Sequence, residues 1–95
     1  MSAYLVFTRD KIFDQAEFDT YSNEAPATLA GHPAKPLAFY GKHEDLEGGP
    51  TDGTVIIEFP SAEAAKAWYD SPAYRKVREH RFKSATYRVT LVEGV

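Results

Sequence analysis

EFPSAEAAKAWYDSPAYRKVREHR, residues Glu58–Arg81, contains the end of one element and the starts of two more. It begins at the end of an apolar strand, TVIIEFP (Thr54–Pro60), and passes directly into a helix for which Ser61 is a suitable N-terminal cap. Ser71 is in the same position before a second helical segment, and Pro72 occupies the first helical position, where proline is tolerated. The stretch therefore predicts a strand followed by two helices in succession.

The remaining elements lie on either side of this stretch. AYLVFTR (Ala3–Arg9) and ATYRVTLVEGV (Ala85–Val95) are rich in β-branched and aromatic residues, which predicts a first and a last strand. A helix is expected to begin after Asp14 and to break near Pro26, because proline removes a backbone donor. KPLAFYGKHEDLEG (Lys35–Gly48) predicts the second strand.

The expected order of elements is βαββαβ. Each β-α-β crossover should be right-handed, so this order predicts a ferredoxin-like α+β sandwich with four antiparallel strands and both helices on one face. With 95 residues the chain is the size of one domain, which we expect to cover residues 1–95.

Two of the strands carry apolar side chains on both faces. In the first strand Tyr4 and Val6 alternate with Leu5 and Phe7, and the third strand adds Ile56. Helices cover only one face, so the other would expose an apolar patch that a second copy of the chain can bury. The pattern therefore predicts a homodimer; the alternative is that these residues lie near a sheet edge and stay partly exposed.

Composition argues against several classes of partner. The net charge is −3 and the isoelectric point about 5.5, which disfavours nucleic acid and anionic membranes. There are no cysteines for disulfides or thiolate chemistry. No apolar run reaches membrane-spanning length and no basic leader precedes one, so a cytoplasmic protein is expected.

Glu58 is the candidate general base. It shares a face of its strand with Ile56, on the side expected to meet the second copy or at its rim. A poorly hydrated carboxylate has its ionised form disfavoured, which is one way to obtain a base that works near neutral pH. The alternative is a structural ion pair with Arg9 or Arg88.

Two aromatic residues are candidates for ligand binding. Trp68 follows Ala64 and Ala65 at helical spacing, so it should point at the sheet, and Tyr21 should point inward from the first helix. Such side chains can line an apolar pocket and offer a hydroxyl and an indole N–H. The alternative is plain core packing.

Cations recur in the last helix. Arg75, Arg78 and Arg81 are spaced by three residues, and we expect Arg81 to hold an anionic group or to stabilise developing negative charge. The alternative is that these cations complement the dipole of the helix and stay solvated.

The three histidines, His32, His43 and His80, show no metal-ligand spacing, so no metal is expected. His80 is a further candidate ligand-binding residue. No Gly-rich phosphate loop is present, and no cofactor is expected.

Several motifs together resemble the family known as domain of unknown function 1330. They are EFPS at Glu58–Ser61, AAKAWYDSPAY at Ala64–Tyr74, LEG at Leu46–Gly48, GHP at Gly31–Pro33 and the terminal LVEGV. The family looks like a member of the dimeric α+β barrel superfamily, in which two ferredoxin-like sheets pack face to face. The resemblance implies ligand cavities between sheet and helices. It implies no particular reaction, because the superfamily holds cofactor-free monooxygenases, lactone isomerases, haem-degrading enzymes and stress-response proteins.

These observations lead to two hypotheses from different classes. The first is a homodimeric α+β barrel that binds a small, partly apolar organic molecule and, if it is an enzyme, performs cofactor-independent isomerisation or oxygenation with Glu58 or a histidine as base. The second is a non-catalytic structural or regulatory dimer with a filled core. Whether the protein is an enzyme stays open at this level.

Overall fold

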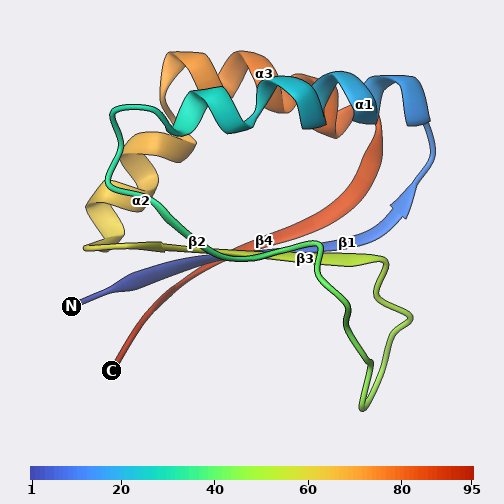
Figure 1. Cartoon of the computed structure of the whole chain (residues 1–95), viewed down its shortest axis with the longest axis horizontal. Coiled ribbons are helices and arrows are strands. Elements are labelled where there is room, and N and C mark those ends of the chain that lie inside the picture. Colours follow the sequence, from blue (N-terminus) through green and yellow to red (C-terminus); the bar gives the residue numbers. More distant parts are fainter.

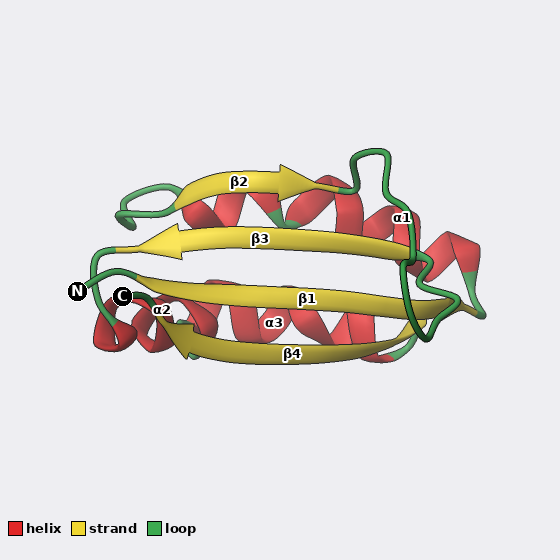
Figure 2. Cartoon of the chain, turned by 90° about the horizontal axis from the view of Figure 1, so that it is seen from below, coloured by secondary structure: helices red, strands yellow, loops and turns green.

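The computed structural model describes residues 1–95 and places a four-stranded sheet beneath a layer of helices (Figure 1). The elements, in chain order, are β1 (Ala3–Ile12), α1 (Gln15–Glu24), the short 3-10 helix η1 (Pro26–Leu29), β2 (Lys35–Phe39), β3 (Gly53–Phe59), α2 (Ala62–Tyr69), α3 (Pro72–Phe82) and β4 (Ala85–Glu93). The strands lie in the order β2-β3-β1-β4, and every neighbouring pair is antiparallel (Figure 2). This is the βαββαβ sandwich expected from the sequence.

Each of the three α-helices begins where the sequence predicts a cap. The side chain of Asp14 accepts from the backbone N–H of Glu17 at 3.1 Å at the start of α1. Ser61 and Ser71 accept in the same way at the starts of α2 and α3. These bonds satisfy backbone donors that have no partner inside the helix, which is why such residues mark helix starts.

The second strand is shorter than predicted. β2 ends at Phe39, and the expectation that it continues to Gly48 is wrong. Tyr40 has a backbone φ of 52°, in the left-handed region, which turns the chain out of the sheet. The following loop lies on the face of the sheet opposite the helices (Figure 1). Within this loop the Thr51 N–H donates a 2.9 Å hydrogen bond to the Asp45 carboxylate.

The core lies between the helices and one face of the sheet. Leu5 and Phe7 point into it from β1, together with alternate residues of β3. Tyr4 and Val6 therefore belong to the uncovered face, where the β1–β3 register pairs Val6 with Ile56. No helix of the chain combines the length and the apolar character that crossing a membrane requires.

Candidate functional site

A first cavity of about 270 Å³ lies on the helix side of the sheet, between α1 with η1 and the strands β2 and β3. Twelve residues line it, nine of them hydrophobic, and they include Phe7, Val55, Ile57 and Leu29. The Pro26 break contributes to this space, because it ends α1 and turns the chain into η1 above the β2 edge. The cavity is therefore a largely apolar chamber between sheet and helices.

Trp68 belongs both to the core and to the wall of this cavity. Its side chain is 2% exposed, and its ring packs against Tyr74 at 4.1 Å and against Phe59 at 5.9 Å between centroids. The indole N–H donates to the hydroxyl of Thr28 at 3.1 Å. The polar atom of Trp68 is thus engaged within the protein, and the ring presents an apolar surface to the cavity.

Tyr21 reaches the same cavity from α1. Its hydroxyl lies 2.7 Å from the hydroxyl of Tyr74, and either group can donate. Burial raises the pKa of both tyrosines, and the charge of Arg81 opposes that shift only in part. Both hydroxyls therefore stay protonated well into the alkaline range.

This pair makes the stability of the protein sensitive to alkaline pH. In the unfolded chain each tyrosine loses its proton near pH 10, whereas burial keeps Tyr21 and Tyr74 protonated above that in the folded protein. The stability is therefore fully present below about pH 10 and falls above it, by about 1.4 kcal/mol per pH unit for each group. Urea unfolding between pH 8 and pH 11.5 measures this slope. Tyr21→Phe removes one of these groups, so it should reduce the slope by about 1.4 kcal/mol per pH unit. Equal slopes for parent and variant would contradict the assignment.

A second hydroxyl pair crosses the sheet. Tyr40, just beyond β2, hydrogen bonds through its hydroxyl to the hydroxyl of Tyr87 on β4. Its ring passes over Gly53, where a Cβ atom would lie 2.7 Å from the ring. The Arg9 guanidinium lies 4.5 Å from the ring centroid and is itself held by Asp52 at 2.8 Å. Only glycine leaves room for this crossing.

The sequence analysis did not single out Tyr40, Tyr74 or Tyr87. The available signals were the glycine that opens the third strand and, for Tyr74, its helical spacing with Val77. Neither signal states that two hydroxyls will meet across the molecule.

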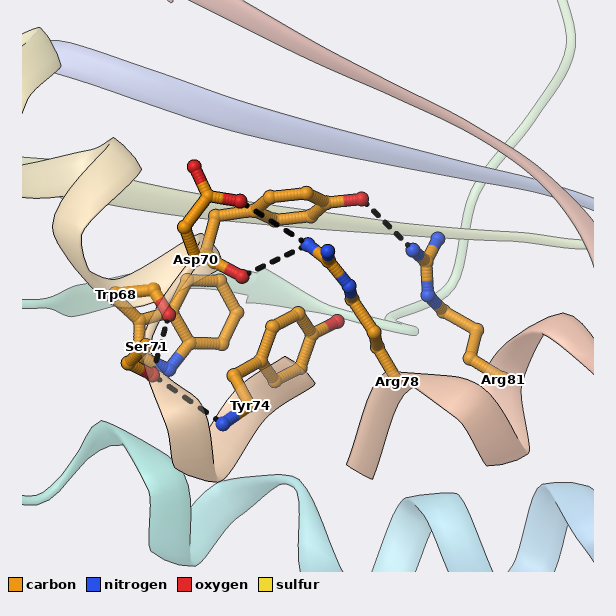
Figure 3. A network of polar contacts seen from close by, with 7 residues as sticks. Trp68, Asp70, Ser71, Tyr74, Arg78 and Arg81 are labelled. Atoms are coloured by element: carbon orange, nitrogen blue, oxygen red, sulfur yellow. Dashed lines mark hydrogen bonds and ion pairs between the residues drawn. The ribbon is translucent and has the colours of Figure 1, made fainter. Parts of the chain in front are cut away.

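A second cavity, of about 460 Å³, lies at the opposite edge of the sheet, between α3 and β4. Arg81 lines it and is 2% exposed, so the alternative that this cation stays solvated is wrong. Its Nη2 donates to the hydroxyl of Tyr69 at 3.1 Å, and Figure 3 shows this contact as a dashed line. Arg78 instead donates to the Tyr69 carbonyl at 3.0 Å and lies 3.5 Å from Asp70.

The three arginines of α3 therefore do not form one patch. Arg81 continues the buried stripe that begins with Tyr74 and Val77, while Arg75 is exposed. The physical reason is that 74, 77 and 81 are spaced by three and four residues, which keeps them on one helix face, whereas steps of three alone drift around the helix.

Glu58 and His80 lie outside both cavities. Glu58 is on the uncovered face, where its carboxylate accepts from the Tyr4 hydroxyl at 3.2 Å. The alternative of an ion pair with Arg9 or Arg88 is wrong, because these arginines lie beside Asp52 and Asp10. His80 Nδ1 lies 2.7 Å from a carboxylate oxygen of Glu17 and links α3 to α1. No three acidic or histidine side chains gather as a metal site would require.

The structure thus groups the candidate residues in three places. Tyr21 and Trp68 meet at the first cavity, Arg81 lies at the second, and Glu58 is on the far side of the sheet. Residues 2–95 match the model of the family described as Domain of unknown function (DUF1330). The chain belongs to this family.

Solved structures similar to this DUF1330 protein share its fold at low sequence identity. A protein of unknown function from Rhodopseudomonas palustris is 16% identical with a TM-score of 0.75, over 99% of this chain and 83% of that one. A dimeric ferredoxin-like protein of unknown function from Thermobifida fusca is 13% identical with a TM-score of 0.67, over 99% and 92%. SnoaB, a cofactor-independent oxygenase from Streptomyces nogalater, is 11% identical with a TM-score of 0.64, over 99% and 92%.

These likenesses confirm the ferredoxin-like α+β fold predicted from the sequence. At such identities they carry the fold alone, and the activity of SnoaB is not thereby an activity of this chain. No curated protein matches the sequence.

Proposed function

We propose that this DUF1330 protein is a homodimer that binds a small, partly apolar organic molecule in the first cavity. The observation that carries the proposal is the cavity itself, about 270 Å³ between sheet and helices with a mostly hydrophobic lining. Known small-molecule sites begin at about 300 Å³, so the occupant is a compact molecule. A ligand there supplies contacts that the lining side chains otherwise lack.

The chemistry of the lining favours binding over turnover. The hydroxyl of Tyr21 and the indole N–H of Trp68 already have partners inside the protein. If turnover occurs at this cavity, the tyrosine hydroxyls are proton donors. Glu58, on the opposite face, can act as a base only on a substrate held between two packed sheets. The non-catalytic alternative is supported by these polar groups, because each already has a hydrogen-bond partner within the protein. The oxygenase alternative is supported only by the fold shared with SnoaB.

The uncovered sheet face supports the dimer. Val6 and Ile56 pair there in the middle of the sheet, and Tyr4 lies beside Glu58. The loop after β2 extends past this face and carries Leu46, which is 84% exposed (Figure 1). An apolar patch of this kind marks an interaction surface, and a two-fold pairing buries it on both copies. The similar protein from Thermobifida fusca is described as dimeric.

Filling the cavity tests the binding proposal. Leu29 lines the cavity, so Leu29→Trp should occupy it and weaken binding of toluene, a neutral apolar probe, by at least about tenfold, the loss that a difference of about 1.4 kcal/mol produces. The measurement is the change in backbone amide NMR shifts during a toluene titration, with Val55 and Ile57 as reporters.

Leu46→Trp is the matched control, because it makes the same substitution at an exposed loop position away from the cavity. It should bind toluene as the parent does. Equal toluene affinity of Leu29→Trp and the parent, or shifts that gather elsewhere, would remove the first cavity as the binding site.

A further inference from the structure

The second cavity contains a buried positive charge without a counterion. Arg81 is 2% exposed, and its guanidinium carries a positive charge. None of the four ion pairs of the chain includes it. The only hydrogen bond of the guanidinium runs from Nη2 to the Tyr69 hydroxyl, and the buried Nε has no partner. A buried charge is costly unless it is paired, so this arrangement needs an explanation.

Aromatic rings compensate the charge only in part. The guanidinium carbon lies 5.1 Å from the ring centroid of Phe82, 5.2 Å from that of Tyr87 and 5.6 Å from that of Phe7. Ring faces attract a cation, but they do not accept hydrogen bonds from all the N–H groups of a guanidinium. Asp70, which lies close to Tyr69 in the chain, is 3.5 Å from Arg78 and is directed to that residue (Figure 3).

We propose that Arg81 is the anchor of a carboxylate site, and that the second cavity takes a small monocarboxylate with an apolar or aromatic body. Arg81 lines this cavity, and its planar guanidinium makes one side-chain hydrogen bond, which leaves N–H groups free to pair with the two oxygens of a carboxylate. The lining also includes Phe82, Tyr87 and Val89, whose side chains can contact a hydrocarbon body.

The lining favours a carboxylate over a phosphate. Six of its eight residues are hydrophobic, and Arg81 is the one cation among them. The Tyr87 hydroxyl is already bound to Tyr40 on the side of the first cavity. A phosphate needs more donors and more positive charge than this wall supplies. The site is separate from the first cavity, at the other edge of the sheet, so it does not depend on the function proposed there.

Benzoate is a suitable probe, and its neutral isostere benzamide is the matched ligand control. At neutral pH benzoate should shift the backbone amide resonances around Tyr87 and Val89 in a saturable way, and benzamide should bind at least tenfold more weakly. Benzoate should also raise the melting temperature of the parent in a concentration-dependent manner, because it binds only the folded protein. Equal binding of benzoate and benzamide, no saturable shift, or shifts confined to the first cavity would overturn the proposal.

Two variants test whether benzoate binding depends on the charge of Arg81 itself or only on the overall charge of the helix. Arg81→Met removes the buried charge and keeps an apolar side chain of similar length, and benzoate affinity should fall at least tenfold. Arg75→Met removes the same charge from an exposed position of the same helix, and affinity should stay within twofold of the parent. Arg81→Met that binds benzoate as the parent does would overturn the proposal.

Two further measurements test whether these variants fold and whether the first cavity still binds toluene. Replacing a lone buried charge with an apolar residue should leave the melting temperature of the unliganded protein unchanged or raised. Should Arg81→Met fail to fold, Arg81→Lys keeps the charge but lacks the planar edge, and it should also bind benzoate more weakly; unchanged affinity would count against the site. Toluene binding at Val55 and Ile57 should be the same in the folded Arg81 variant and the parent, so failure of one site is distinguishable from failure of the other.

Discussion

Replacing Trp68 with alanine is expected to lower the free energy of unfolding by about 3–5 kcal/mol, the usual cost of truncating a buried tryptophan. The side chain is 2% exposed and packs against four further aromatic residues, Phe7, Phe59, Tyr69 and Tyr74. The truncation also leaves the hydroxyl of Thr28 without its indole donor. Since a domain of this size has only about 5–15 kcal/mol of stability, the variant should lose a large part of it.

Urea unfolding at one fixed protomer concentration measures the loss, because the stability of a dimer depends on concentration. Phe13→Ala is the matched control: it also truncates an aromatic residue, but one that is 58% exposed, and its effect should be much smaller. A loss for Trp68→Ala as small as that of the control would show that the indole belongs to the cavity wall and contributes little to the core.

Introducing a charge at Val6 is expected to convert the proposed dimer into a monomer. Val6 pairs with Ile56 in the middle of the uncovered face. By two-fold symmetry Val6→Asp places two unpaired carboxylates in the interface, and leaving a charge buried without a partner costs about 3–5 kcal/mol. The dissociation constant of the dimer should therefore rise by at least about a thousandfold.

Native mass spectrometry and size-exclusion chromatography with light scattering measure this change. Ala73→Glu serves as control, because it adds the same charge at an exposed position in the first turn of α3, on the helix layer. The control should remain a dimer. A monomeric parent would contradict the dimer proposal, and a dimeric Val6→Asp would place the interface elsewhere. A reproducible adduct mass on the parent would also identify the class of bound molecule.

Sequence reasoning placed some site residues and misjudged the setting of others. Tyr21 and Trp68 were expected to point inward, and they do so because helical spacing decides which face meets the sheet. Arg81 follows the same rule, since its spacing from Val77 places it on the buried stripe. The charge of Arg81 favoured a solvent-exposed position. The sequence pattern around it could not show that aromatic rings from other elements would surround the guanidinium. Glu58 was expected on the uncovered face, but its partner is Tyr4 and not an arginine.

The order of the elements, the helix starts at Asp14, Ser61 and Ser71, and the apolar character of both faces of β1 and β3 follow from the amino-acid sequence alone. These features depend on interactions between residues a few positions apart, which the order of residues encodes directly. Two features are visible only in the folded chain. Tyr40 leaves the sheet and passes over Gly53 to reach Tyr87, and Trp68 and Arg81 line two different cavities. Such features depend on how side chains from distant segments fill one space, because packing is a property of the assembled layers.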